Sequence, residues 1–114
     1  MKRSEINLSI ELDEENVPER IFWDASDKGE EDMAESQAIS VAIWDHMQKN
    51  TLRIDLWTKE MPIDEMKRFY IDCLGGMAQS LMNATGDEFM AHEMDALCEK
   101  LVKHVENEYK KGGE

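Results

Sequence analysis

The sequence predicts an α+β fold: a four-stranded antiparallel sheet, arranged as a meander, followed by two C-terminal helices packed on one of its faces. Before residue 58, apolar residues alternate with polar ones in several segments, which is the two-residue period of a half-buried strand. After Pro62, the apolar positions follow the spacing of a helix face. A strand therefore passes into a helix near residue 60. At this length we expect residues 1–114 to form one domain with a single core.

Four segments carry the strand pattern. Residues 6–12 alternate clearly between apolar and polar side chains, and residues 20–25 follow a turn rich in acidic residues, so we expect these two segments to form a hairpin. Residues 38–45 alternate and are rich in β-branched side chains, which favours a strand over a helix. Residues 51–58 supply the fourth strand. Short turns and one longer loop between the strands indicate an antiparallel meander.

The longer loop, residues 26–37, is polar and acidic, which predicts an exposed surface segment. Residues 24–35 also align loosely with a calcium-binding EF-hand loop. Lys28 replaces an oxygen ligand in that alignment, and a strand precedes the loop where an EF-hand has a helix. A solvated acidic loop is therefore favoured, and cation binding is left as the alternative.

The first predicted helix begins near Pro62, which suits the first helical position because its missing N–H needs no partner there. Asp64 and Glu65 follow in the first turn, where acidic groups complement the helix dipole. Gly75 and Gly76 interrupt the helix, and we expect them to permit close packing against the sheet or the next helix. Its apolar stripe consists of Met66, Phe69, Tyr70, Cys73, Leu74, Met77 and Leu81.

A second helix is predicted to start directly after the first one ends near Asn83. Thr85 and Glu88 have the spacing of a capping box, in which each side chain bonds the other residue's backbone N–H. Cys73 and Cys98 lie in these two helical patterns beside apolar residues, and we expect both to be buried free thiols. The apolar stripe of the second helix consists of Phe89, Met90, Met94, Leu97, Cys98, Leu101, Val102 and Val105.

The charge is strongly negative, with 13 basic residues against 26 acidic ones and a formal net charge of −13. Such a field repels nucleic acid and anionic lipid and attracts basic partner surfaces. No segment approaches the length of a transmembrane helix, and residues 1–5 lead into a strand and not into a continuous apolar segment. We therefore expect no signal peptide and no membrane insertion.

No pattern of catalytic or metal-binding residues stands out. His46, His92 and His104 are far apart, and the last two, although on one predicted helix, are separated by more than three turns. The chain has no Cys-x-x-Cys, no His-Glu-x-x-His and no Gly-x-Ser-x-Gly sequence. The sequence therefore predicts a protein that is not an enzyme and holds no metal or cofactor.

The outer face of the predicted sheet is the candidate binding surface. If the helices cover the face bearing the apolar residues of the first and fourth strands, the opposite face carries Phe22, Trp44 and Trp57. Arg53 and Asp55 of the fourth strand share that face. The alternatives are that the acidic loop folds over the aromatic residues, or that the register is wrong by one residue.

Three parts of the sequence resemble the GldC family of small proteins associated with bacterial gliding motility. The first is Thr51-Leu-Arg-Ile-Asp-Leu-Trp-Thr-Lys-Glu-Met-Pro-Ile-Asp-Glu-Met-Lys, where the likeness is most specific over Arg53 to Met66; the others are Ser4-Glu-Ile with Ile10-Glu-Leu-Asp, and Ala84-Thr-Gly. The resemblance implies an accessory role on the inner side of the membrane, with partners from the gliding machinery or the secretion system to which it is tied. It provides no catalytic residue.

A weaker similarity concerns architecture only. Four antiparallel strands followed by two helices, together with strong acidity, are similar to the SecB export chaperones, whose apolar grooves hold unfolded clients. This chain lacks the long segment that separates the helices of SecB. A SecB-like chaperone is therefore the alternative function. Homo-oligomerisation is also left open, because the outer aromatic face or an edge strand offers a way to pair two copies.

Overall fold

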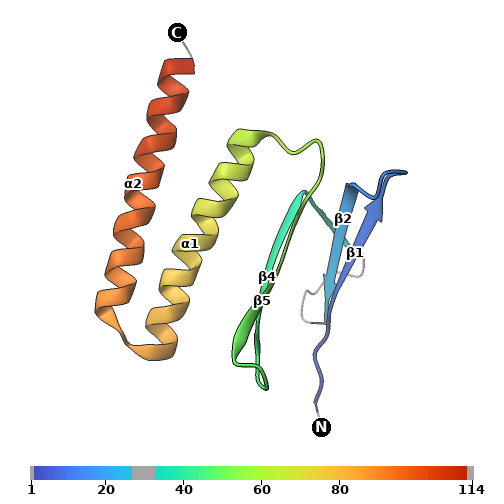
Figure 1. Cartoon of the computed structure of the whole chain (residues 1–114), viewed down its shortest axis with the longest axis horizontal. Helices are drawn as coiled ribbons and strands as arrows, with labels where there is room; N and C mark the ends of the chain where they lie inside the picture. The colour runs from blue at the N-terminus through green and yellow to red at the C-terminus, as the bar shows by residue number, and fades with distance from the viewer. Residues whose placement is uncertain (1, 27–32, 113–114) are drawn as a thin grey trace. The chain divides into compact units, whose positions relative to one another are not determined.

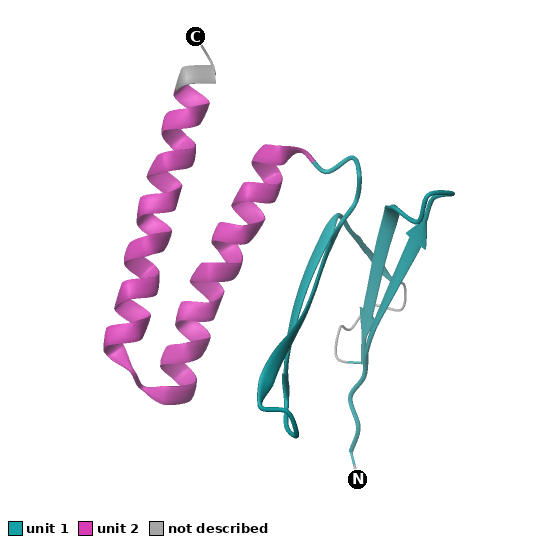
Figure 2. Cartoon of the chain, in the orientation of Figure 1, with its two compact units in different colours: residues 1–61 teal, residues 62–114 magenta. Residues whose placement is uncertain are grey.

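The computed structural model describes residues 2–26 and 33–112, with side chains as far as Lys110. The chain divides into two compact units, residues 1–61 and residues 62–114 (Figure 2). Within the described residues, the strands belong to the first unit and the helices to the second (Figure 1). The α+β class and the order of strands before helices are therefore confirmed.

The first sheet has three antiparallel strands in the order β1-β2-β3, namely Ile6–Leu12, Pro18–Ala25 and Ala34–Ser36. Ile10 pairs with Ile21, and Leu8 pairs with Trp23. Directly opposed residues point to the same side of a sheet, so the alternating apolar side chains of β1 and β2 share one face. Ile21 is the largest fully buried side chain among the described residues, with 0% of its surface exposed.

The second sheet is a two-stranded hairpin formed by β4, Ala38–Asp45, and β5, Asn50–Trp57. Its turn is held by the Asp45 carboxylate, which accepts hydrogen bonds from the backbone N–H groups of Met47 and Gln48 at 2.9 and 2.7 Å. The predicted strand over residues 38–45 is confirmed, and the fourth strand begins and ends one residue earlier than predicted.

The single four-stranded meander predicted from the sequence is wrong, because the strands form one sheet of three and one of two. The physical reason lies in residues 34–36, which the sequence analysis assigned to a loop. They form β3 and pair with residues 21–23, so they occupy the edge of β2 that a meander would have given to β4. The Ser36 hydroxyl then donates to the Ala38 carbonyl at 2.7 Å, at the bend between β3 and β4. Residues 27–32 of the predicted loop lie outside the described residues.

Thr58 and Lys59, the two residues after β5, form hydrogen bonds with other parts of the first unit. The N–H of Thr58, which is buried, donates to the Gln37 carbonyl at 2.8 Å, and the N–H of Lys59 donates to the Pro18 carbonyl at 3.1 Å. The Lys59 ammonium also bonds Asp13 in the β1–β2 turn at 3.0 Å. The backbone N–H of Val17, followed by Lys59, lowers the pKa of the Asp13 carboxyl from its ordinary value.

The second unit is a helical hairpin of α1, Ile63–Thr85, and α2, Glu88–Gly112 (Figure 1). Pro62 is the N-cap residue of α1, one position before the first helical residue, and Asp64 and Glu65 occupy the first turn as predicted. Across the hairpin, Lys67 bonds Glu108 at 2.9 Å. Among the described residues, no helix is both long and apolar enough to cross a membrane.

The predicted capping box at the start of α2 is wrong. Gly86 adopts a left-handed conformation, with φ of 70°, and its N–H donates to the Met82 carbonyl, so α1 continues through Thr85. The Thr85 hydroxyl donates to the Leu81 carbonyl at 2.8 Å and is thereby used by α1. Asp87 caps α2 instead, because its carboxylate accepts from the N–H of Met90 at 3.0 Å.

The two helices meet along a stripe of small residues. A Cβ atom added to Gly75 would lie 3.8 Å from the Cys98 sulfur, an ordinary van der Waals contact, and the Cys98 thiol donates to the Ile71 carbonyl at 3.7 Å. Ala78, one helical turn further along α1, is 1% exposed. The packing predicted at the glycine pair is therefore an ordinary contact of Gly75 with the other helix, and a Cβ atom added to Gly76 would meet no described atom within 4 Å. Neither Cys73 nor Cys98 forms a disulfide, as predicted, but both are only partly buried. Packing of the helices on one face of the sheet stays a prediction.

Candidate functional site

Four of the five predicted binding residues lie on one face of the β4–β5 hairpin. Trp44 pairs with Thr51 and Trp57 pairs with Ala38, whereas Arg53 pairs with Ala42. Since successive residues of a strand alternate between faces, these side chains and Asp55 share the face opposite to the apolar one. We call this the outer face, defined by Ala38, Ser40, Ala42 and Trp44 of β4 and Thr51, Arg53, Asp55 and Trp57 of β5.

The two tryptophans stand at opposite ends of the outer face. Trp44 keeps 63% of its surface exposed and Trp57 keeps 46%. Trp57 is six residues further along β5 than the residue that pairs with Trp44, so the two lie roughly 20 Å apart. In the observed register both tryptophans lie opposite to the apolar face, so the predicted alternative, a register error of one residue, is wrong for this hairpin.

Between the tryptophans lies a cluster of Arg53, Asp55 and Ser40. The Arg53 guanidinium donates from Nη2 to Asp55 Oδ1 at 2.9 Å and from Nε to Asp55 Oδ2 at 3.2 Å. The Ser40 hydroxyl donates to Asp55 Oδ1 at 2.6 Å and accepts from Arg53 Nη2 at 3.0 Å. The Arg53 guanidinium, followed by the Ser40 hydroxyl, holds the pKa of the Asp55 carboxyl below its ordinary value.

This lowered pKa gives the cluster a pH signature. Because the pKa of Asp55 is lower in the folded chain than in the unfolded one, its contribution to stability is present above about pH 3.9 and is lost as pH falls through the folded pKa. Asp55→Asn should therefore lower the urea midpoint near neutral pH, and the difference from wild type should shrink in acid. A difference that does not change with pH would contradict this assignment. Ser40→Ala should move the Asp55 pKa, followed by carboxyl NMR, part of the way back to its ordinary value.

Phe22, the fifth predicted residue, belongs to the other sheet. It lies on the polar face of β2, where the Arg20 guanidinium sits 4.8 Å from the centre of its ring. Arg20 also pairs with Glu35 of β3 at 3.3 Å. Glu35 belongs to β3, and the pairing of β3 with β2 brings its carboxylate to Arg20. This strand, which was predicted as a loop, therefore also shapes the surroundings of Phe22. The structure therefore separates Phe22 from the other four residues.

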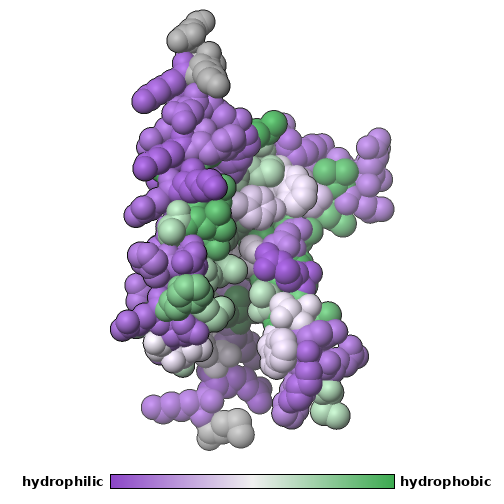
Figure 3. All heavy atoms as spheres, turned by 60° about the vertical axis from the view of Figure 1, so that its left-hand side comes forward, coloured by the Kyte–Doolittle hydropathy of each residue, from purple (hydrophilic) through white to green (hydrophobic). Residues whose placement is uncertain are grey.

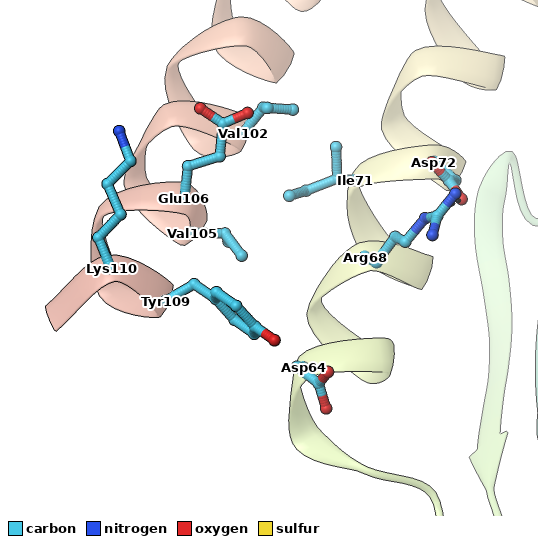
Figure 4. Close-up of a pocket in the computed structure, with 9 residues that line it drawn as sticks. All are labelled: Asp64, Arg68, Ile71, Asp72, Val102, Val105, Glu106, Tyr109 and Lys110. Atoms are coloured by element: carbon cyan, nitrogen blue, oxygen red, sulfur yellow. Dashed lines mark ion pairs between the residues drawn. The ribbon is translucent and has the colours of Figure 1, made fainter. Parts of the chain in front are cut away.

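A groove of about 460 Å³ lies in the second unit, between the two helices at their open end (Figure 4). Val105 and Tyr109 of α2 point across it toward α1 (Figure 4). Its rim carries charges of both signs, including Arg68 and Asp72, which lie 4.0 Å apart. The lining residues are Asp64, Arg68, Ile71, Asp72, Val102, Val105, Glu106, Tyr109 and Lys110. No sequence motif marked this groove, because its lining comes from two distant segments.

Within the described residues, no group of three or more His, Cys, Asp or Glu side chains is placed to hold a metal ion. Half of the segment that aligns loosely with an EF-hand loop, residues 27–32 of 24–35, lies outside the described residues.

These features define the class of protein: a small acidic α+β protein that presents an outer sheet face of two tryptophans around an ion pair. Residues 18–107 match the GldC-like family, described as gliding motility-associated protein GldC-like. Since the match covers most of the chain, this chain belongs to the GldC-like family, which confirms the resemblance found in the sequence. No curated protein and no solved structure matches the chain.

The matched range includes every predicted binding residue and both helices almost to the end of α2, but begins after β1. The family description names an association with gliding motility and names no reaction. The outer face therefore lies within the part of the chain that the family shares.

Proposed function

We propose that this chain is a non-enzymatic accessory protein of bacterial gliding motility, acting in the cytoplasm by binding another protein through the outer face of the β4–β5 hairpin. Membership of the GldC-like family supports the association with gliding. The partner is a protein of the gliding or secretion machinery. The outer face supplies the mode of action.

The observation that carries this proposal is the arrangement of Trp44 and Trp57 around the Arg53–Asp55 pair. Tryptophan and arginine are the residues that most often dominate binding energy at protein interfaces. The bidentate contact and the Ser40 hydroxyl hold the guanidinium in place before any partner arrives. A side chain that is already fixed loses less conformational entropy on binding, so the face is prepared for association.

The charge of the chain indicates the chemistry of the partner surface. With a net charge of −13, the chain attracts basic surfaces at long range and accelerates encounter with them. We therefore expect a basic partner with an apolar centre that accepts the indole rings. Its binding should weaken as salt rises, because exposed charges are screened within about 8 Å at physiological ionic strength.

The test is affinity capture with wild type and with the Trp44→Ala, Trp57→Ala double variant, compared by quantitative mass spectrometry. We expect the double variant to lose at least about tenfold of the protein that wild type enriches most, since truncating a binding hot spot costs 2 kcal/mol or more. The matched control is Phe89→Ala with Tyr109→Ala, which removes two other aromatic rings, 74% and 75% exposed, from the helical unit.

The double variant keeps Trp23, the third of the three tryptophans in the chain, so its fluorescence reports whether the first unit remains folded. Equal capture by wild type and a folded double variant would contradict binding through the outer face. Loss of capture by the control pair alone would move the interface to the helices.

The alternative is a SecB-like chaperone, and the helical unit gives it one specific support. Apolar side chains, including Met77, Met90 and Leu97, are about half exposed on the two helices. Figure 3 shows hydrophobic residues, in green, among hydrophilic ones on the face that it draws. The inter-helix groove would accept one apolar side chain of an unfolded client (Figure 4). However, the similarity to SecB was based on a single four-stranded sheet, and the strands form two separate sheets instead.

A chaperone of this kind should suppress the aggregation of several unrelated unfolded proteins at stoichiometric concentration. Light scattering during dilution of denatured clients measures this. Val105→Lys, which places a charge in the groove, should abolish the effect if the groove holds clients. If the wild-type protein does not suppress aggregation, the chaperone function is excluded.

A further inference from the structure

The free edge of β4 lacks the features that normally prevent strand pairing. Natural proteins protect edge strands with charged residues, prolines, bulges or short length. β5 carries Arg53 and Asp55, β1 carries Glu11 with an irregularity in its register beside it, and β3 has only three residues. Residues 38–44 of β4 are uncharged and contain no proline, and their register with β5 is regular. Among the described residues, β4 pairs with β5 alone.

The hydrogen-bond pattern identifies which backbone groups of β4 point to the free edge. The N–H of Thr58 donates to the Gln37 carbonyl, and these two residues continue the β4–β5 register. In an antiparallel pair, alternate residues direct their backbone groups to the same neighbour. Odd-numbered residues of β4 therefore face β5, and even-numbered ones face outward. At Ala38 both backbone groups bond the Ser36 hydroxyl, which leaves the outward groups of Ser40, Ala42 and Trp44 for a further strand.

We propose that two copies of this chain pair through the free edges of their β4 strands, antiparallel and about a two-fold axis at Ala42. The result is a four-stranded sheet in the order β5-β4-β4-β5. A two-stranded hairpin is marginally stable alone, and three or more strands with an apolar face are needed for independent stability. The pairing supplies about six backbone hydrogen bonds, two for each of three residue pairs.

A second copy suits this edge because the side chains that would face each other across the junction do not repel each other. In the pairing about Ala42, Ser40 lies opposite Trp44 of the second copy, and Val41 lies opposite its Ile43. The net charge of −13 disfavours association, but residues 38–44 place no like charges across the junction. The apolar residues of the two β4 strands fall on one common face, because the pairing preserves their alternation.

A hollow beside the edge offers room for the incoming side chains. It measures about 430 Å³ and lies within the first unit, where Leu8 and Trp23 of the first sheet and Ile39 and Val41 of β4 contribute apolar lining. Ile43 of the second copy, opposite Val41, would project on the same face as these β4 side chains. The pairing therefore gives this half-exposed isoleucine an apolar environment that the single chain does not provide.

The same pairing would place an aromatic ring beside the Arg53 guanidinium. Its bond to the Ser40 hydroxyl, at 3.0 Å, draws it from β5 over β4. Trp44 of the second copy would lie beside Ser40 on the same face, so its indole ring comes within reach of the guanidinium for a cation–π contact. The chain's own Trp44 is diagonal to Arg53 across the hairpin, so the pairing would place a second tryptophan beside the guanidinium, on the side of Ser40.

The test is the mass of the purified chain by sedimentation equilibrium over a range of concentrations. We expect wild type to shift from 13.2 kDa to twice that mass, and to do so at lower concentration in high salt, because salt screens the mutual repulsion. Ala42→Pro removes an outward N–H without breaking the β4–β5 ladder, and should raise the dimer dissociation constant at least about tenfold. Ala42→Thr is the control, since it keeps the N–H and favours a strand.

Ala42→Glu provides a second variant in case proline disturbs the fold. Within one chain the new carboxylate faces Arg53 across the strand pair, which supports the hairpin, whereas at the two-fold axis it meets its own copy. It should weaken the dimer most at low salt. A wild type that remains at 13.2 kDa at all concentrations, or a folded Ala42→Pro variant that dimerises as wild type does, overturns the proposal. The purified chain is used alone, so the result is independent of any gliding partner.

Discussion

Replacing Ile21 with alanine is expected to lower the free energy of unfolding of residues 1–61 by about 2–5 kcal/mol. Ile21 is fully buried at the centre of β2, where it pairs with Ile10 of β1 and Ser36 of β3. The substitution removes apolar contacts and leaves a cavity that this small unit has little means to fill. Since whole domains are stable by only about 5–15 kcal/mol, this one change removes a large part of the total.

The measurement is urea unfolding followed by tryptophan fluorescence. All three tryptophans belong to the first unit, so this signal reports the strands. Ile10→Ala, on the neighbouring strand but not fully buried, is the control and should cost less. A loss below about 1 kcal/mol for Ile21→Ala would contradict the position of the core in the first sheet.

Replacing Ala78 with leucine is expected to destabilise the helical hairpin by about 1–3 kcal/mol. Ala78 is 1% exposed and lies on the face of α1 that also carries Ile71 and Gly75, where the two helices approach. A larger side chain there must push the helices apart. Far-UV circular dichroism at 222 nm reports the helices and therefore follows the second unit.

Met77→Leu, on the adjacent but half-exposed position, serves as the control and should be nearly neutral. Together, the two probes also test the predicted single domain. If the chain unfolds as one cooperative domain, Ile21→Ala should shift the circular dichroism transition as well as the fluorescence transition. Separate shifts would show that the two units unfold independently.

The parts of the fold that were predicted correctly are those with a strong local signal. The alternation of Ile39, Val41 and Ile43 specified β4, and the change of period after Pro62 specified α1. The placement of Trp44 and Trp57 on one face followed from the same alternation, because the side of a strand is fixed by parity.

The parts that were missed have no local signal. Residues 34–36 form only three residues of strand within an acidic segment, and their pairing with β2 is a long-range property. Gly86 adopts a left-handed backbone conformation, and α1 therefore ends at Thr85. Asp87 is then the residue that caps α2. The helices meet at Gly75 and Ala78, whose small side chains give no strong apolar signal in the sequence.

The grouping of the candidate residues on one face was predicted in part for the same reasons. Trp44, Arg53, Asp55 and Trp57 come from one hairpin, so periodicity placed them together. Phe22 was assigned to the same face on the assumption of one continuous sheet, and β3 removes that assumption. The role of Ser40 depends on an opposed pair across two strands, since Ser40 faces Asp55 only in the observed register.

The most direct test of the central claim is gliding itself. In the organism that encodes this chain, the gene should be replaced by wild type, by the Trp44→Ala, Trp57→Ala double variant, or by the Phe89→Ala, Tyr109→Ala control. The speed of single cells on a surface is then measured at matched protein levels. If the protein acts through the outer face, cells with the double variant should glide as poorly as cells lacking the gene, while cells with the control should glide like wild type. Normal gliding by the double variant would contradict the claim that this protein acts through the outer face of the β4–β5 hairpin.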